Sequence, residues 1–118
     1  MNNRTGETSA TGWWEQASMG RQEMEALRIS ISSVAVSGSG IDPVGVFTLQ
    51  GRLSEDGSVD LLKNYLGQHR VRYLGRWDGS KRLWGQWQLQ GMSGPWEIRL
   101  RDHEKVGEVE EMKLEALQ

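Results

Sequence analysis

The chain has 118 residues, of which 36% are hydrophobic, so it is long enough to form one domain around a single core. Its 14 basic and 16 acidic residues nearly cancel, which argues against nucleic acid or an anionic membrane surface as a partner. No cysteine is present, and this excludes disulfide frameworks, thiol chemistry and cysteine-ligated zinc.

The first eleven residues are polar, and we expect them to form a disordered tail before a folded domain over residues 12–101. The tail lacks the apolar core of a secretion signal. No stretch approaches the roughly 20 apolar residues that cross a bilayer as a helix. These features favour a cytoplasmic protein.

The apolar residues between 12 and 101 alternate with a period of two, and turn signals interrupt them about every 8 to 12 residues. This pattern is typical of an antiparallel meander. Eight strands are predicted, over residues 12–19, 24–31, 34–40, 44–54, 58–66, 69–77, 82–90 and 94–101.

The turn lengths test whether the inward faces of neighbouring strands agree, since a loop of the wrong length would turn one core face to solvent. The loop after Leu53 pairs that residue with Val59, and the loop after Trp77 pairs it with Leu83. Both pairings join apolar residues. Because eight open strands would expose aggregation-prone edges, we predict an all-β fold, an up-and-down barrel of eight antiparallel strands.

Residues 102–118 differ in composition from the rest of the chain and are acidic. Val109, Met112 and Ala116 recur at near-helical spacing, whereas Met112, Leu114 and Ala116 alternate as in a strand. The segment is therefore expected to be a short C-terminal helix or a tail.

Glycine stands two residues before tryptophan at four places, residues 12–14, 75–77, 85–87 and 94–96. Two residues at this spacing share one face of a strand. An inward glycine leaves space for the indole of a neighbouring strand, as a narrow barrel requires. The repeat therefore predicts tightly packed hairpins.

The motif at residues 12–14 resembles the opening of the calycin-type barrels, which include lipocalins, fatty-acid-binding proteins and avidins. The resemblance implies that Trp14 closes the barrel floor and that an arginine, Arg99 or Arg101, lies over it. The predicted strand directions bring Trp77 to the same end. The expected floor residues are Gly12, Trp14, Trp77 and Arg99.

A second resemblance extends over most of the chain. The glycine-rich stretch at residues 38–47, followed by Lys63, Tyr65 and His69, is similar to a family of bacterial domains without an assigned activity. It therefore implies no function for these residues.

Lys63, Tyr65, His69 and Tyr73 share the predicted inner face, where a merely filled barrel should hold few polar groups. Together they could fix the carboxylate or phosphate of an amphipathic ligand between apolar walls. In the alternative interpretation, Lys63 reaches solvent at the mouth and Asp42 is its structural ion-pair partner. The candidate ligand-binding residues are Lys63, Tyr65, His69, Tyr73, Asp42, Phe47, Trp87 and Trp96.

Catalysis and metal binding have little support in the sequence. His69 and His103 are the only histidines, and neither has a nucleophile and a carboxylate arranged around it. Neither has a second ligand at metal-binding spacing. We therefore expect no enzyme activity, no metal and no cofactor.

Leu62, Leu74 and Trp84 point outward on three successive predicted strands and lie diagonal to one another. Such an apolar stripe predicts a dimer contact or a protein partner, unless the C-terminal segment covers it. Two functions are therefore expected. The preferred one is non-enzymatic binding of a small amphipathic or aromatic molecule in the barrel mouth, and the alternative is a protein-interaction or oligomerisation module.

Overall fold

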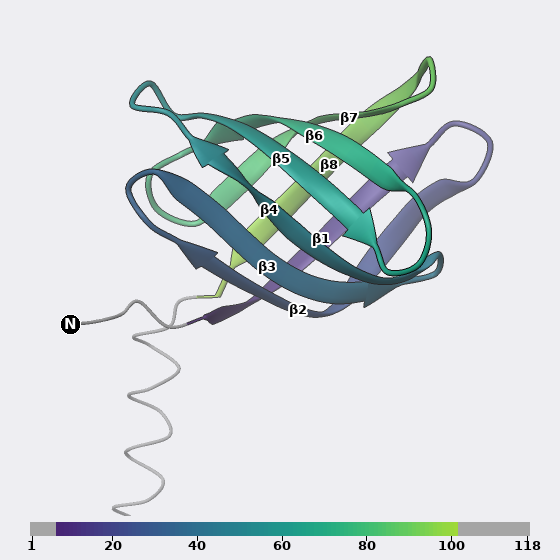
Figure 1. The fold of residues 1–118 in the computed structure, drawn as a ribbon, viewed down its shortest axis with the longest axis horizontal. Coiled ribbons are helices and arrows are strands. Elements are labelled where there is room, and N and C mark those ends of the chain that lie inside the picture. Colours follow the sequence, from purple (N-terminus) through teal and green to yellow (C-terminus); the bar gives the residue numbers. More distant parts are fainter. Residues whose placement is uncertain (1–6, 102–118) are drawn as a thin grey trace, which may run out of the picture.

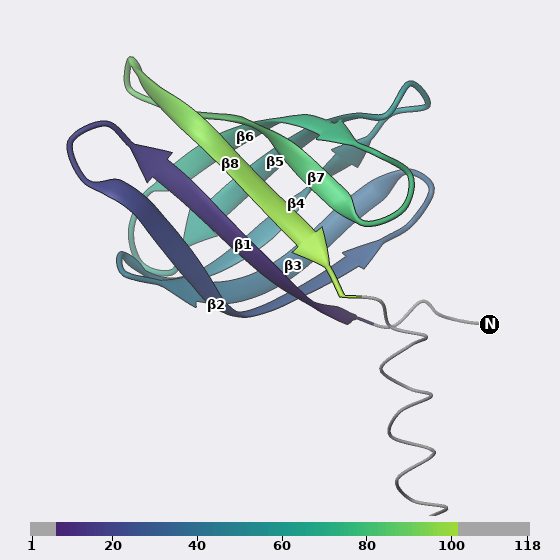
Figure 2. The same cartoon turned by 180° about the vertical axis from the view of Figure 1, so that it is seen from behind.

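The computed structural model describes residues 7–101, which form one antiparallel sheet that closes into a barrel (Figure 1). The strands are β1 (Thr8–Gln16), β2 (Gly20–Ile31), β3 (Ala35–Asp42), β4 (Gly45–Leu53), β5 (Ser58–Tyr65), β6 (Arg70–Trp77), β7 (Arg82–Leu89) and β8 (Met92–Leu100). They follow one another around the barrel in sequence order, and β1 pairs with β8 to close it (Figure 2). The predicted eight-stranded up-and-down barrel is confirmed.

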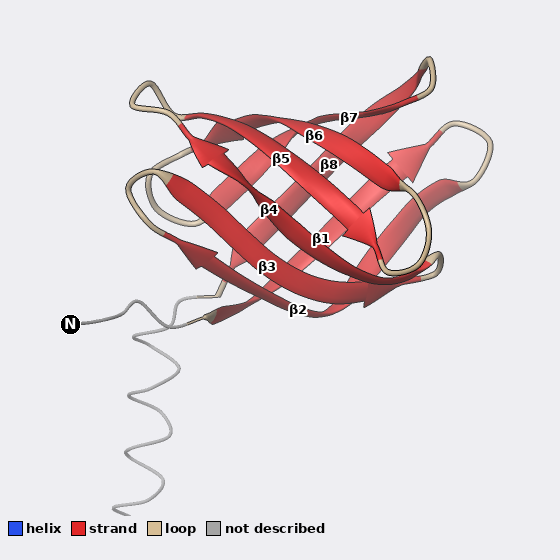
Figure 3. Cartoon of the chain, viewed as in Figure 1, coloured by secondary structure: helices blue, strands red, loops and turns tan. Residues whose placement is uncertain are grey.

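Every regular element within the described range is a strand (Figure 3). Residues 7–101 accordingly contain no helix long and apolar enough to cross a membrane. The predicted C-terminal segment, residues 102–118, lies outside the described residues.

The predicted strand registers are confirmed on both hairpins that the turn lengths addressed. Leu53 pairs with Val59, and Trp77 pairs with Leu83. Phe47, Leu49, Leu61 and Tyr73 are among the core residues that these registers turn inward. Period-two alternation therefore identified the core face of β4 to β7 correctly.

The first strand begins four residues earlier than predicted, at Thr8. Residues 8–11, which were assigned to a disordered tail, form strand because they are hydrogen-bonded between β2 and β8. Ala10 is buried there although its neighbours are polar. As a consequence, Trp14 lies near the end of its strand, not near the beginning.

This shift makes the predicted floor wrong. We call the barrel end with the turns after β1, β3, β5 and β7 the mouth, and the opposite end, where residues 7 and 101 lie, the far end. Trp14 lies at the mouth, whereas Trp77 is half-buried at the far end. Arg99 points outward and forms an ion pair with Glu97, so it does not cover Trp14.

Three glycines of the repeat allow close approach of neighbouring strands. Gly75 and Gly85 face each other, and a Cβ atom on either would lie 1.9 Å from a backbone oxygen of the other strand. Trp96 pairs with Gly85, and its indole crosses that glycine to donate a hydrogen bond to the Leu74 carbonyl at 3.3 Å. A Cβ atom on Gly94 would lie 2.8 Å from the indole nitrogen of a neighbouring tryptophan.

The fourth glycine, Gly12, makes room for aliphatic side chains, so the prediction of an adjacent indole is wrong there. The atoms nearest to a Cβ at Gly12 belong to Leu27, Ile98 and Met24, at 2.9 to 3.0 Å. The glycine is nevertheless buried and tightly enclosed. Its role is to let these three side chains fill the barrel beside β1.

Candidate functional site

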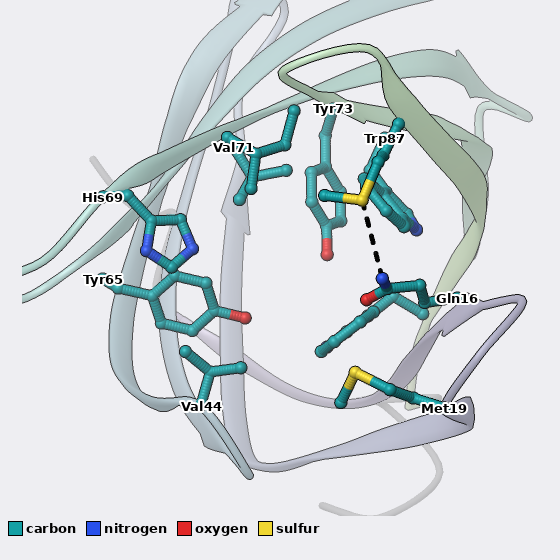
Figure 4. Close-up of a pocket in the computed structure, with 11 residues that line it drawn as sticks. Gln16, Met19, Val44, Tyr65, His69, Val71, Tyr73 and Trp87 are labelled. Atoms are coloured by element: carbon teal, nitrogen blue, oxygen red, sulfur yellow. Dashed lines mark hydrogen bonds between the residues drawn. The ribbon is translucent and has the colours of Figure 1, made fainter.

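A cavity of about 110 Å³ opens at the mouth of the barrel (Figure 4). It lies between β1, β5, β6, β7 and the turns beside them. The lining residues are mostly apolar or aromatic: Trp14, Gln16, Met19, Val44, Tyr65, His69, Val71, Tyr73, Trp87, Leu89 and Met92.

Two tryptophans form one wall of the cavity. The rings of Trp14 and Trp87 meet edge to face with their centroids 6.1 Å apart, an arrangement that aromatic pairs favour. The indole of Trp87 also donates a hydrogen bond to the backbone carbonyl of Glu15 at 2.9 Å, which fixes its orientation. This wall is therefore rigid and apolar.

The opposite wall is formed by Tyr65 and His69, whose ring centroids lie 5.1 Å apart. Tyr65 is buried, whereas His69 is exposed at the rim. Gln16 lies across the opening and donates a long hydrogen bond, of 3.7 Å, to the Met92 sulfur (Figure 4). The polar groups of this cavity are thus few and concentrated at its entrance and its base.

Asp42 joins the walls of the cavity to the turn between β3 and β4. Its Oδ2 atom accepts hydrogen bonds from the indole of Trp14 at 3.0 Å, the hydroxyl of Tyr65 at 2.7 Å and the ammonium of Lys63 at 2.6 Å. Its Oδ1 atom accepts from the backbone nitrogens of Val44 and Gly45. One carboxylate therefore orients two residues that line the cavity.

Lys63 lies inside the barrel with a fully buried side chain, so the expectation that it reaches solvent at the mouth is wrong, whereas its expected ion pair with Asp42 is present. Besides its ion pair with Asp42, its ammonium donates a hydrogen bond to the hydroxyl of Tyr73 at 3.2 Å. It also lies 4.2 Å from the ring centroid of Phe47 and 5.4 Å from that of Trp14. Aromatic faces attract a desolvated cation, so the site is built to hold a buried charge.

Burial lowers the pKa of Lys63 to about 8, although the hydrogen bond and the charge of Asp42 act in the opposite direction. Burial alone would raise the pKa of Asp42, but the bonds from Lys63 and Tyr65 outweigh it and the pKa is lowered. Burial also raises the pKa of both Tyr65 and Tyr73. At neutral pH the two phenols stay protonated beside an ionised pair.

The pKa of Lys63 predicts a pH dependence of stability. Between pH 8 and 9.5 the unfolded chain holds more protons at Lys63 than the folded one does, because the unfolded pKa is near 10.5. The free energy of unfolding should therefore rise with pH, by at most about 1.4 kcal/mol per pH unit. Urea denaturation at several pH values measures this slope.

The Lys63→Met variant is the control for this prediction, because it keeps the aliphatic stem and removes the titrating group. Between pH 8 and 9.5, the free energy of unfolding of the wild type should rise relative to that of Lys63→Met. A constant difference would show that the pKa of Lys63 is not lowered. Lys81→Met, on the exposed surface, shows what the loss of one lysine charge does by itself.

The structure divides the predicted ligand-binding residues into two groups. Tyr65, His69, Tyr73 and Trp87 line the cavity, as expected of residues that share the inner face. The other four do not line it: Asp42, Lys63, Phe47 and Trp96. Trp96 packs on Tyr73 with its ring centroid 4.9 Å away, and Lys63 is already paired, so it is not placed to receive a ligand's anion.

Several cavity residues were missed. Trp14 was assigned to the floor from the resemblance to calycin-type barrels, and a predicted strand start at residue 12 agreed with that position, whereas β1 begins at Thr8. Met19 lies in the turn after β1, and Met92 is the first residue of β8, a strand that was predicted to begin only at residue 94. Both residues were therefore expected in turns, where no alternation pattern assigns a side chain to a face. The only signal in the sequence was their apolar character, which Leu66 in the turn after β5 shares. Met19, Leu66 and Met92 are 44 to 54% exposed.

The apolar stripe on the outer face, formed by Leu62, Leu74 and Trp84, has the predicted register. Charged side chains also lie along it. Leu62 is 39% exposed, whereas Leu74 and Trp84 are half-buried. Leu62 pairs with Arg72 and Leu74 with Asp60, and these two charged side chains form an ion pair of 2.8 Å across the line between the leucines. Whether this surface binds a partner stays a prediction, and the C-terminal segment proposed to cover it lies outside the described residues.

Within residues 7–101, no three histidine, aspartate or glutamate side chains converge where a metal ion could bind. No family model, curated protein or solved structure matches the chain. The chemistry of the cavity is therefore the basis for a functional assignment.

Proposed function

We propose that the protein binds a small, mainly apolar or aromatic molecule in the mouth cavity. The observation that carries the proposal is the cavity itself, whose walls are aromatic rings and aliphatic side chains with few polar atoms. Ligand sites are typically concave and apolar, with a small number of placed polar groups, and the mouths of barrels are common positions for them. Binding of this kind is also what the resemblance to calycin-type barrels implies.

The size of the cavity supports a ligand of about one aromatic ring. A closed apolar cavity of roughly 150 Å³ can hold benzene, and the present cavity of about 110 Å³ is open on one side. The exposed apolar residues of the mouth, Met19, Leu66 and Met92, would extend contact with the part of the ligand that protrudes.

Val71→Phe should abolish this binding, because Val71 is a buried wall residue and a phenyl ring there would occupy the space of the ligand. The test is a titration with ethylbenzene and acetophenone, followed through the indole N–H signals of Trp14 and Trp87 in ¹H,¹⁵N NMR spectra. In the wild type these signals should shift in a saturable manner. In Val71→Phe they should stay unchanged up to the solubility limit of each probe.

Arg70→Phe is the matched control, since it adds the same ring to the outward face one residue away. This variant should bind both probes with the affinity of the wild type. If neither probe shifts the indole signals of the wild type, or if Val71→Phe binds as well as the wild type does, the mouth cavity is not the binding site.

A further inference from the structure

The hydroxyl of Tyr73 is a hydrogen-bond donor that the fold leaves unused. The side chain is 1% exposed and lines the cavity, with its oxygen directed toward the centre (Figure 4). That oxygen accepts a hydrogen bond from the Lys63 ammonium at 3.2 Å, but among residues 7–101 no group accepts the hydroxyl proton. Buried donors are rarely left without an acceptor, so this proton points to a missing partner.

Tyr73 differs in this respect from the neighbouring tyrosine, Tyr65, whose hydroxyl proton has an acceptor. Tyr65 also directs its hydroxyl to the base of the cavity, but it donates that proton to Asp42 at 2.7 Å. The hydroxyl of Tyr73 is further polarised, because its oxygen accepts a hydrogen bond from the charged ammonium of Lys63. Hydrogen bonds in such chains strengthen one another, so Tyr73 is the better donor to a third group.

The electrostatics of the site disfavour a negatively charged ligand. Among the described residues that line the cavity, none is lysine or arginine. The buried cation, Lys63, is already neutralised by Asp42 at 2.6 Å, and a second carboxylate would face the charge of Asp42. Moving an unpaired ion from water into an apolar site costs far more free energy than moving a neutral polar group. An uncharged acceptor therefore fits the cavity best.

We infer that the natural ligand is an uncharged molecule with a carbonyl or similar oxygen that accepts the hydrogen bond of Tyr73, while its apolar part packs against the wall formed by Trp14 and Trp87. This inference rests on the proposed function and specifies the chemistry of the same site. It replaces the anionic anchor at Lys63 that the sequence suggested.

The test is a double comparison with acetophenone and ethylbenzene, which have the same shape apart from the carbonyl oxygen. Tyr73→Phe should weaken acetophenone binding about fivefold to tenfold, the effect of one neutral hydrogen bond. It should leave ethylbenzene binding unchanged or slightly tighter. Tyr65→Phe is the matched control, because the hydroxyl it removes already donates to Asp42, and it should not alter the ratio of the two affinities.

A second measurement does not depend on how the variants fold. The carbonyl stretching band of ¹³C-labelled acetophenone should move to lower wavenumber when it is bound to the wild type, relative to its position in hexane. Benzoate should not bind at concentrations that saturate acetophenone.

Three results would overturn the inference while leaving the proposed function intact. They are an equal fall in affinity for acetophenone and ethylbenzene in Tyr73→Phe, an unshifted carbonyl band, and tighter binding of benzoate than of acetophenone. If neither neutral probe binds the wild type, the proposed function itself fails and the inference fails with it.

Discussion

Replacing Asp42 by alanine is expected to lower the free energy of unfolding by about 3–5 kcal/mol, the usual cost of removing one member of a buried ion pair. The substitution leaves the ammonium of Lys63 without its counter-charge inside the barrel. It also removes the acceptor for Trp14 and Tyr65 and the cap of the turn at Val44. Urea denaturation followed by tryptophan fluorescence at pH 7 measures the loss.

Two further variants separate charge from turn geometry. Asp42→Asn keeps an oxygen for the turn and removes the charge, so it should retain most of the destabilisation if the ion pair dominates. Adding Lys63→Met to Asp42→Ala should restore part of the lost stability, because the unpaired ammonium is then gone. If the double variant is less stable than Asp42→Ala, the buried charge is not the cause.

Gly85→Ala is the second substitution with a large expected effect, a loss of about 3 kcal/mol. The added Cβ would lie 1.9 Å from the Leu74 carbonyl oxygen and 2.5 Å from the Cα of Gly75. Both are backbone atoms, so β6 and β7 would have to separate locally. The same carbonyl accepts the hydrogen bond of Trp96, which would be disturbed as well. Chemical denaturation gives the loss directly.

The control for Gly85 is Gly79→Ala, in the turn between β6 and β7. No atom lies within 4 Å of a Cβ there, but φ is +86°, so a modest strain of about 1 kcal/mol is expected. A loss at Gly85 no greater than that at Gly79 would mean that the strands accommodate a methyl group between them.

The candidate site could be predicted only in part. The alternation of β5 and β6 placed Tyr65, His69 and Tyr73 together correctly, since hairpin register follows from loop length. The environment of Lys63 could not be derived in this way. Its pairing with Asp42 was one of two interpretations of the sequence, and register could not decide between them, because the pair joins β3 to β5, which are not neighbours in the sheet.

By itself, the sequence determined the all-β class, the number of strands and the core face of β4 to β7, because a period of two and loop parity are local properties of the chain. Only the tertiary structure decided where β1 begins and how β2 continues past Ala26, whose φ of 50° marks a bulge. That bulge lets Met24 and Leu27 both face inward, against strict alternation. Closure between β1 and β8 is a contact between the two ends of the domain, and it moved Trp14 from the expected floor to the wall of the mouth cavity.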